Sequence, residues 1–309
     1  MSSDTHVPVL LGPVLEGLEI KVDGLYVDGT FGRGGHSSAI LQRLNADGRL
    51  IAIDRDPQAV AAAAPLLTND PRFTLIRSDF ADLARQIDQM GLTGGVDGML
   101  FDLGVSSPQL DEAERGFSFL RDGPLDMRMD PDAGISAAEW LNTGSEKALK
   151  QVIYKYGEER DAPRIARAIV VARANAEIAT TGQLADIVSS VIPAHTRKKH
   201  PATKTFQAIR IFINDELEQL DKVLKQSLDL LSTGGRLCVI SFHSLEDRIV
   251  KRFMRDASRE SEQWRGMPNV PPEFQPKLKL VGKVITASAE EIAANVRARS
   301  ARLRIAERN

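Results

Sequence analysis

Short apolar runs recur through the first hundred residues, and each of them leads to an aspartate. Leu25–Val27, Leu50–Ile53, Phe73–Ile76 and Gly98–Phe101 are predicted strands, and they lead to Asp28, Asp54, Asp79 and Asp102. Helical stretches separate them, a pattern typical of a parallel α/β sheet. Because ligands in such sheets bind beyond the carboxyl ends of the strands, we expect these carboxylates at one ligand-binding edge.

The next strand-like run, Arg236–Ile240, comes only after about 130 further residues, far more than one crossover helix needs. Helix signals fill this interval. Ser145 precedes a run to Gly157, Asp161 one to Ala174, and Thr181 starts one that stops before Pro193. An inserted, mainly α-helical domain is therefore predicted.

A long amphipathic helix from Phe206 to Leu231, ended by Gly234-Gly235, would return the chain to the sheet. Leu278–Val281 and Arg302–Ile305 could supply closing strands. The predicted organisation is a doubly wound, mostly parallel Rossmann-like domain of residues 1–108 and 213–309, interrupted by the helical domain 109–212.

Composition sets outer limits on the class of protein. A length of 309 residues suits two domains, and 42% hydrophobic with 27% charged residues suits a folded chain. The single cysteine, Cys238, excludes internal disulfides and paired Cys-x-x-Cys zinc motifs, so no metal is predicted. No signal peptide or long apolar run is found, and the expected location is the cytoplasm, without a membrane.

A glycine-rich loop, Asp28 to His36, joins the first predicted strand to a helix from Ser37 to Leu44. Such loops bring the backbone close to a ligand in several cofactor classes. Asp28 would repel a dinucleotide pyrophosphate but suits the cationic amine and sulfonium of S-adenosylmethionine. A turn or cap role for Asp28 is the alternative.

The later strand ends fit the same ligand. Asp54 can accept both ribose hydroxyls, or cap the helix that follows. Asp79 and Phe80 can meet the adenine amino group and ring, or be an ordinary loop carboxylate and a core phenylalanine. No Gly-Lys-Ser/Thr follows the glycines, which excludes a P-loop.

Longer motifs resemble one known family over essentially the whole chain, the bacterial 16S ribosomal RNA cytosine-N4 methyltransferases of the RsmH or MraW type. The motifs are Tyr26–Ser37, Ala52–Asp56, Asp102–Asp111, Arg115–Phe119, Gly123–Asp130, His200–Ile211 and Ser241–Arg248. The resemblance implies a class I S-adenosylmethionine methyltransferase fold, with the helical insert recognising substrate. It implies cofactor contacts from Gly34, Gly35, His36, Asp54, Phe80, Asp102 and Gln109.

The resemblance also implies the substrate: the exocyclic N4 of a cytidine in the decoding region (P site) of 16S rRNA, in the small ribosomal subunit or its assembly intermediate. The sequence leaves the oligomeric state open, with a homodimer as one arrangement.

An exocyclic cytosine amine is a poor nucleophile, and acceptors on its hydrogens favour attack on the methyl group. Asp102 is the candidate acceptor, although it could only hold the cofactor, and the Ser106–Gln109 loop could shape the pocket or form a turn. His243 could accept a proton, or be a structural histidine. Asp126 and Arg128 could contact the base, or pair with each other.

Basic clusters in a chain of net charge −2 suggest a localised RNA track, although solvated faces are the commoner explanation for any one of them. They are Arg197, Lys198, Lys199, Lys204 and Arg210; Arg248, Lys251, Arg252, Arg255 and Arg259; and Arg297, Arg299, Arg302 and Arg304. Phe117, Phe119 and Phe206 are the candidates for base stacking. Two rival functions are a non-catalytic RNA-binding assembly factor and an NAD-dependent oxidoreductase.

Overall fold

The computed structural model describes residues 8–63, 69–192, 200–260, 262–264, 266, 267 and 269–309. Chain contacts divide the protein into two compact units. The sheet unit comprises Met1–Gly104 and Leu217–Asn309, and the helical unit comprises Val105–Glu216. The sequence places the insert at 109–212, so the boundaries found here lie a few residues outside it.

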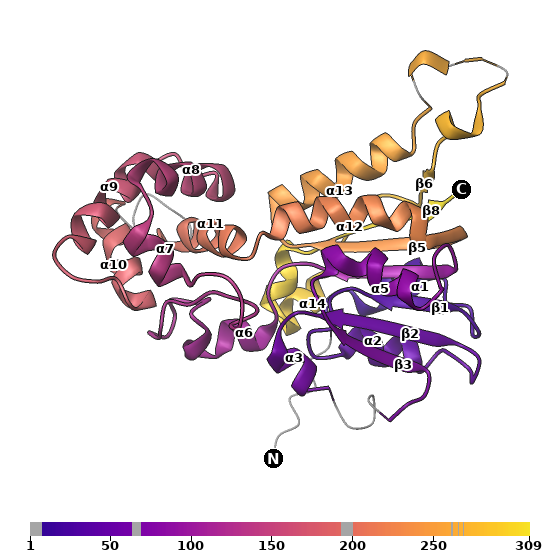
Figure 1. Cartoon of the computed structure of the whole chain (residues 1–309), viewed down its shortest axis with the longest axis horizontal. Coiled ribbons are helices and arrows are strands. Elements are labelled where there is room, and N and C mark those ends of the chain that lie inside the picture. The colour runs from indigo at the N-terminus through magenta and orange to yellow at the C-terminus, as the bar shows by residue number, and fades with distance from the viewer. Residues whose placement is uncertain (1–7, 64–68, 193–199, 261, 265, 268) are drawn as a thin grey trace. The chain divides into compact units, whose positions relative to one another are not determined.

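The sheet unit is built on one sheet with strand order β3-β2-β1-β4-β5-β8-β6, and β7 also pairs with β8 (Figure 1). The strands are β1 (Leu25–Asp28), β2 (Arg49–Asp54), β3 (Phe73–Arg77), β4 (Val96–Asp102), β5 (Leu231–Ser241), β6 (Leu278–Leu280), β7 (Ile285–Thr286) and β8 (Arg302–Arg308). The first five are parallel, and β8 runs antiparallel to its neighbours. The predicted strands are confirmed, as is the doubly wound, mostly parallel fold.

The sheet order reverses between β1 and β4, which are hydrogen-bonded neighbours. Crossovers on either side of such a switch point lead to opposite sides of the sheet, and this leaves a crevice at the carboxyl ends of the two strands. Asp28 ends β1 and Asp102 ends β4. The topology thus brings two of the predicted site carboxylates to the position where this fold binds ligands.

Alternation along each strand supplies a core on both faces of the sheet. On β2, Leu50 and Ala52 belong to one apolar cluster and Ile51 and Ile53 to the other. The first cluster is covered by α1 (Leu11–Leu18) and α2 (Gly35–Leu41), and the second by α5 (Leu83–Gln89), α12 (Glu216–Leu230) and α13 (Ser244–Ala257). Short α3 (Pro57–Ala61) and α14 (Ala289–Ala294) complete this unit.

The helical unit packs around its own apolar cluster, which includes Trp140, Leu149, Ile165, Leu184 and Phe206. Its helices are α6 (Ser107–Asp111), α7 (Ala137–Thr143), α8 (Glu146–Gly157), α9 (Ala162–Arg173), α10 (Thr181–Val191) and α11 (Thr203–Ile213). Ser145 caps α8 as predicted, accepting the N–H of Ala148. α10 starts at Thr181 as predicted, with Thr180 as its cap. The mainly α-helical character of the insert is confirmed.

The single long helix predicted from Phe206 to Leu231 is wrong. The chain leaves the helical path at Asn214 and Asp215, and Asp215 has a left-handed φ of 51°. The reason is tertiary, because the Asn214 side chain donates to Met127 O (2.7 Å) and accepts the N–H of Met129 (2.8 Å). The result is two helices, α11 and α12, instead of one.

The end predicted for that helix is also different. α12 stops at Leu230, and Gly234-Gly235 lie inside β5, where the pairing with β4 shifts register between Val96 and Gly98. Gly234 adopts φ 81°, a conformation that glycine accepts without strain. Two other helices have bounds that differ from the sequence prediction. α2 starts at Gly35 instead of Ser37, and α3 ends at Ala61, with 64–68 outside the described residues. No helix among the residues described is long and apolar enough to cross a membrane.

Candidate cofactor and catalytic site

The glycine-rich loop is held between the two strands that flank β1. Gly29 N donates to Leu100 O of β4 (2.9 Å), and Phe31 N donates to Ile53 O of β2 (3.0 Å). A side chain at Gly29 would place its Cβ 2.3 Å from the Phe101 ring, so the backbone must be bare there. Gly34 has φ 72° and leads directly into α2, which starts with Gly35 and His36. These contacts fix the loop at the switch point.

Asp28 is buried and organises the loop from beneath. Its Oδ2 accepts the Ser37 hydroxyl (2.7 Å), and its Oδ1 accepts the N–H of Thr30 (3.1 Å). Burial raises the pKa of the Asp28 carboxyl above its usual range, against the lowering effect of these hydrogen bonds. The local role that the sequence offered as an alternative is therefore present. Direct contact between Asp28 and a cofactor stays a prediction.

Asp54 ties the loop to the end of β2. Its Oδ2 accepts Gly32 N–H (2.8 Å) and its Oδ1 accepts Asp56 N–H (2.9 Å). Asp56 is the residue that caps α3, through Gln58 N, so the cap alternative for Asp54 is wrong. Burial is the main cause that raises the pKa of Asp54, to about 6. A partly buried carboxylate of this kind favours a ligand that brings hydroxyl donors or positive charge.

Asp79 and Phe80 lie just after β3. Asp79 Oδ1 lies 3.2 Å from Arg55 Nη1 and accepts the Gln219 side-chain N–H (3.3 Å). Phe80 is only partly buried, and its ring meets Phe101 edge-on at a centroid distance of 6.2 Å. A partly exposed phenylalanine beside the switch point is compatible with a ligand ring packing against it.

Asp102 differs from the other carboxylates because the described residues do not satisfy it. Its Oδ1 is buried and has no hydrogen-bond partner among the residues described, while its Oδ2 lies 3.7 Å from His36 Nδ1. Burial raises the pKa of Asp102 to about 6, against the opposing effect of His36 and with smaller contributions from Asp28 and Glu246. The side chain as a whole is 27% exposed. Asp102 is thus a reachable carboxylate whose charge is poorly compensated.

This set of groups fits a cationic cofactor. Asp28, Asp54 and Asp102 surround one loop, and burial raises the pKa of each. A positive ligand would stabilise their charged forms, whereas a pyrophosphate would add to the repulsion. S-adenosylmethionine supplies an electrophilic methyl group on a cationic sulfur. Among the three carboxylates, Asp102 is the one with a buried oxygen, Oδ1, that has no hydrogen-bond partner within the described residues.

Gln109, described within the helical unit, is buried and completes a capping box at the start of α6. Its Oε1 accepts the N–H of Ser106 (3.0 Å). The Ser106–Gln109 segment is therefore a capped helix start rather than the simple turn offered as the alternative. In the same unit Asp126 and Arg128 form a bidentate pair with two contacts of 2.8 Å, which is the local pairing alternative.

His243 caps α13. Its Nδ1 accepts the N–H of Glu246 (3.4 Å), while Glu246 Oε2 accepts the N–H of Phe242 (2.8 Å) and of His243 (3.2 Å). This reciprocal arrangement is a capping box in which histidine replaces the usual serine or threonine. The structural alternative for His243 therefore has a physical account. Its Nε2 lies 3.1 Å from Glu246 Oε1, and a proton-accepting role for His243 stays a prediction.

The predicted RNA-binding residues differ in how exposed they are and in whether other protein groups already bind them. Arg197, Lys198 and Lys199 lie outside the described residues. Lys204 is exposed and donates to Glu158 O (2.9 Å), whereas Arg210 forms a two-point ion pair with Glu216 at 2.8 Å. Phe117 and Phe206 are 5% and 4% exposed, so their predicted stacking on a base is wrong for this structure. Phe119 stacks on His200 at 4.5 Å instead.

The other basic clusters differ in the same way. Arg302 and Arg304 both pair with Asp247, at 3.1 and 2.8 Å. On α13, by contrast, Arg248, Lys251 and Arg252 are exposed, and Arg259 is exposed just beyond the end of the helix. The second cluster therefore presents accessible positive charge in the sheet unit, as do Arg297 and Arg299 of the third.

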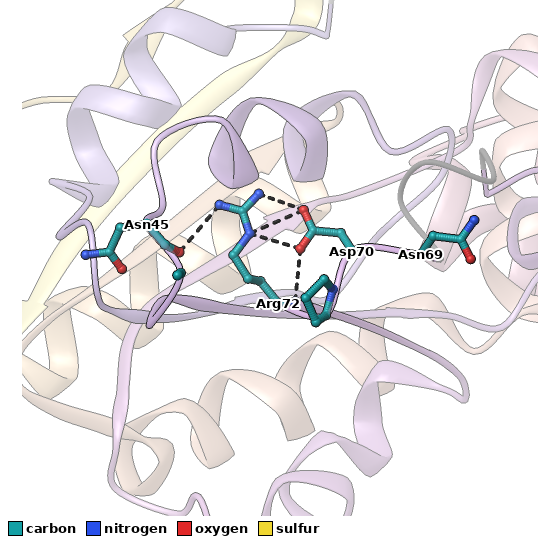
Figure 2. Close-up of a pocket in the computed structure, with 6 residues that line it drawn as sticks. Asn45, Asn69, Asp70 and Arg72 are labelled. Carbon is teal, nitrogen blue, oxygen red and sulfur yellow. Dashed lines mark hydrogen bonds and ion pairs between the residues drawn. The ribbon is translucent and has the colours of Figure 1, made fainter.

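A surface hollow lies at the opposite edge of the sheet, where β2 and β3 begin (Figure 2). Asn45, Asn69, Asp70 and Arg72 line it, and Arg72 is bound by Asp70 (2.6 Å) and by Leu44 O (2.6 Å). Ligands in open α/β sheets bind at the carboxyl ends of the strands, so this hollow is not the expected cofactor site.

Four residues with structural roles at the site were missed from the sequence. Thr30 and Ser37 hold Asp28, Val9 holds His36, and Glu246 completes the cap of α13. The spacing from His243 to Glu246, three residues before an apolar run, is a capping-box signal that could have identified Glu246. No sequence pattern marks Val9, since its contribution is a backbone carbonyl.

Comparisons with known proteins identify the family of the chain. Residues 3–309 match the MraW methylase family. Ribosomal RNA small subunit methyltransferase H of Nitrosococcus oceani is 55% identical over 305 residues, covering 98% of this chain and 97% of the relative.

Solved structures are more distant. An rRNA methylase from Streptococcus thermophilus is 12% identical with a TM-score of 0.41, covering 96% of this chain and 93% of the other. The SMU.1697c protein of Streptococcus mutans, solved in complex with SAH, is 11% identical with a TM-score of 0.43, covering 98% and 99%. The family match, in contrast, spans the sequence of both the sheet unit and the helical unit. The chain therefore belongs to the MraW methylase family, and it is an S-adenosylmethionine-dependent methyltransferase.

Proposed function

We propose that this enzyme transfers the methyl group of S-adenosylmethionine to the exocyclic N4 of one cytidine in the decoding region (P site) of 16S rRNA. The observation that carries the proposal is the 55% identity, over 98% of the chain, to a ribosomal RNA small subunit methyltransferase H. The substrate would be the small ribosomal subunit or its assembly intermediate, in the cytoplasm. The proposal includes a homodimer, which sedimentation equilibrium of the full chain tests.

The chemistry assigns a specific task to Asp102. The N4 lone pair is delocalised into the cytosine ring, so the nitrogen must pyramidalise before it attacks the methyl carbon. A carboxylate that accepts an amine hydrogen favours that change, because it stabilises the positive charge that develops on nitrogen. Asp102 has the required properties, since it ends β4 at the switch point, is 27% exposed and has an unpartnered Oδ1 within the described structure.

Cofactor binding is assigned to residues around the same edge. Gly34, Gly35 and His36 supply the loop and the start of α2, Asp54 the end of β2, and Phe80 the turn after β3. Asp28 supports the loop and adds negative charge beneath it. Gln109 stays in the proposed set on the family resemblance alone.

RNA contacts are proposed on the exposed residues Arg248, Lys251 and Arg252 of α13 and on Arg259 just beyond its end. Lys204 of the helical unit stays in the proposed set. Phosphate binding by such residues releases counterions and gives no sequence discrimination by itself. Arg210 contributes less, because Glu216 already neutralises it. Arg197, Lys198 and Lys199 stay in the proposed set on sequence grounds alone.

The experiment is methyl transfer in vitro to small-subunit particles from cells that lack this protein, with radiolabelled S-adenosylmethionine and mass mapping of the modified nucleoside. We expect N4-methylcytidine at one position. Asp102→Asn should abolish most of the rate, while Asp221→Asn, an exposed carboxylate paired with Lys225 on α12, is the matched control and should keep it. A methyl group on another atom or base would refute the substrate. RNA binding without any transfer would support the non-catalytic assembly factor.

A further inference from the structure

His36 is held by a peptide group that is itself clamped at both ends. The His36 Nε2 lies 3.1 Å from the carbonyl oxygen of Val9, and the N–H of the same peptide unit, on Leu10, donates to Glu291 Oε1 at 2.6 Å. Val9 and His36 are both buried. A carbonyl oxygen can only accept, so Nε2 must carry a hydrogen. The clamp therefore selects one tautomer of the neutral imidazole.

The other ring nitrogen then presents a lone pair to the reaction edge. In the Nε2–H tautomer, Nδ1 has no hydrogen, and it lies 3.7 Å from Asp102 Oδ2. Two acceptors that face each other repel, and one proton between them converts the repulsion into attraction. This arrangement is poised to take up a single proton.

Asp102 is held in place for this role. Its backbone N–H donates to the Thr30 hydroxyl oxygen at 2.6 Å, so the end of β4 is fixed to the glycine-rich loop. The other charged groups that act on Asp102 are Asp28, at the end of β1, and Glu246, near the start of α13, and both are carboxylates. They disfavour a negative Asp102, which strengthens its tendency to bind a proton. The raised pKa of Asp102 agrees with this geometry.

We propose that Asp102 and His36 together accept the proton released by methyl transfer, with Asp102 as the group that touches the amine and His36 as a positioning residue behind it. The inference rests on the proposed function. As the N4–carbon bond forms and the sulfur–carbon bond breaks, the sulfur keeps the bonding pair and N4 becomes positive. An N4–H bond then breaks, its electrons return to nitrogen, and the proton passes to the Asp102 carboxylate, where the Nδ1 lone pair of His36 shares it.

The distance between the partners is compatible with this role. A hydrogen bond needs about 2.7–3.2 Å between the heavy atoms, so the pair must approach by roughly 0.5–1 Å. Catalytic hydrogen bonds often shorten only when substrate is bound. The clamp at Val9 and Leu10 restricts the ring, which leaves the Asp102 side chain as the part that moves.

The first test needs neither RNA nor turnover. Nitrogen NMR of the full chain with ¹⁵N-labelled histidine reports the tautomer of His36, and His36→Gln assigns its signals among the five histidines. We expect the hydrogen of the neutral ring on Nε2 and none on Nδ1. A neutral ring with its hydrogen on Nδ1 would overturn the proposal. Glu291→Ala, which releases the clamp, should broaden or mix the two tautomers.

The second test follows the Asp102 carboxyl itself. With ¹³C-labelled aspartate, its titration should fall near pH 6 in the wild-type protein, and it should move in His36→Gln, which removes the ring nitrogen 3.7 Å from Asp102 Oδ2. The rising limb of the single-turnover pH–rate profile should move in the same direction. His200→Gln, the same chemical change in the helical unit, is the control and should leave the limb in place.

The outcomes separate the two proposals. A purely structural His36 would change stability without moving the Asp102 titration, and that result would overturn the inference. If His36→Gln does not fold, the wild-type nitrogen shifts and the Glu291→Ala comparison decide it alone. A product other than N4-methylcytidine would refute the proposed function, while the tautomer measurement would still stand.

Discussion

The two edges of the sheet unit differ in how their aspartates are paired. At the amino edge, Asp70 is bound by Arg72 through contacts of 2.6 and 2.9 Å, and Arg72 also donates to the carbonyl of Leu44 (Figure 2). At the carboxyl edge, Asp102 has one buried oxygen without a partner in the described structure and a histidine 3.7 Å from the other. Both are aspartates of one unit, yet only the first is fully paired.

The pKa directions follow from this difference. Hydrogen bonds and charge from Arg72 lower the pKa of Asp70, whereas burial raises that of Asp102 to about 6. A paired carboxylate favours the folded state and has little capacity left for a ligand. An unpaired one opposes the folded state and remains available for chemistry. The comparison predicts that matched substitutions at the two edges have opposite consequences.

The largest effect is expected on turnover. Asp102→Asn keeps the shape of the side chain but removes the proton acceptor, and general-base contributions are typically about 10²–10⁴-fold. Single-turnover methyl transfer under saturating cofactor and RNA measures the loss. Full turnover in this variant would show that Asp102 is not the proton acceptor, and the two edges would then not differ in function.

The same variant should gain stability. The folded-state pKa of Asp102 is raised to about 6. The protein is therefore more stable at low pH, where Asp102 is neutral, and it loses this stability as the pH rises through that value and Asp102 becomes charged. Asparagine avoids the loss, so we expect the free energy of unfolding to rise by about 1–3 kcal/mol at neutral pH, after allowance for partial exposure. Urea unfolding across pH measures it. The difference should vanish below about pH 4, near the ordinary carboxyl pKa.

A smaller effect is expected where positive charge is unpaired. Lys251 and Arg252 on α13 are exposed, and no ion pair holds them within the described part of the chain, whereas Arg304 is bound by Asp247. Replacing both with alanine should weaken RNA binding about 10-fold and reduce its salt slope by about 2. Filter binding at several salt concentrations tests this. Lys222→Ala on α12, whose lysine pairs with Glu218, is the control.

The smallest effect should come from the amino edge. Asp70→Asn removes an ion pair that contributes above the ordinary carboxyl pKa and is lost as pH falls through the lowered folded-state value. We expect a cost of about 0.5–1 kcal/mol at neutral pH, shrinking in acid, and unchanged methyl transfer. This pH dependence is opposite in sign to that of Asp102→Asn. The same sign at both sites would contradict the comparison.

Much of the sheet could be predicted because its cause is local. Apolar runs such as Leu50–Ile53 alternate between two buried faces, and each run ends at a residue that breaks the pattern. The aspartates at the ends of β1, β2 and β4 therefore indicate the ligand-binding edge from the sequence alone. The break between α11 and α12 could not be predicted, since Asn214 leaves the helix to bind backbone groups of Met127 and Met129 far away in the sequence.

The site was only partly accessible from sequence for the same reason. Residue types indicated that Asp28, Asp54 and Asp102 belong together, but not which of them would be satisfied. That distinction depends on Ser37, Thr30 and the carbonyl of Val9, which reach the carboxylates or His36 only after folding. His243 shows the converse, because a pattern that suggested chemistry is explained by a capping box.

The strand order has a consequence for how the chain is made. β4 pairs with β1 on one side and with β5 on the other, and β5 in turn needs β8, the last strand of the chain. During synthesis, β1 to β4 therefore emerge with one edge of β4 open, while the whole helical unit is produced before β5 can cover it. Open edges recruit other strands, and long-range pairing is slow. The helical unit, being continuous, can fold before the sheet is complete, and a chain truncated before β5 would expose an aggregation-prone edge of β4.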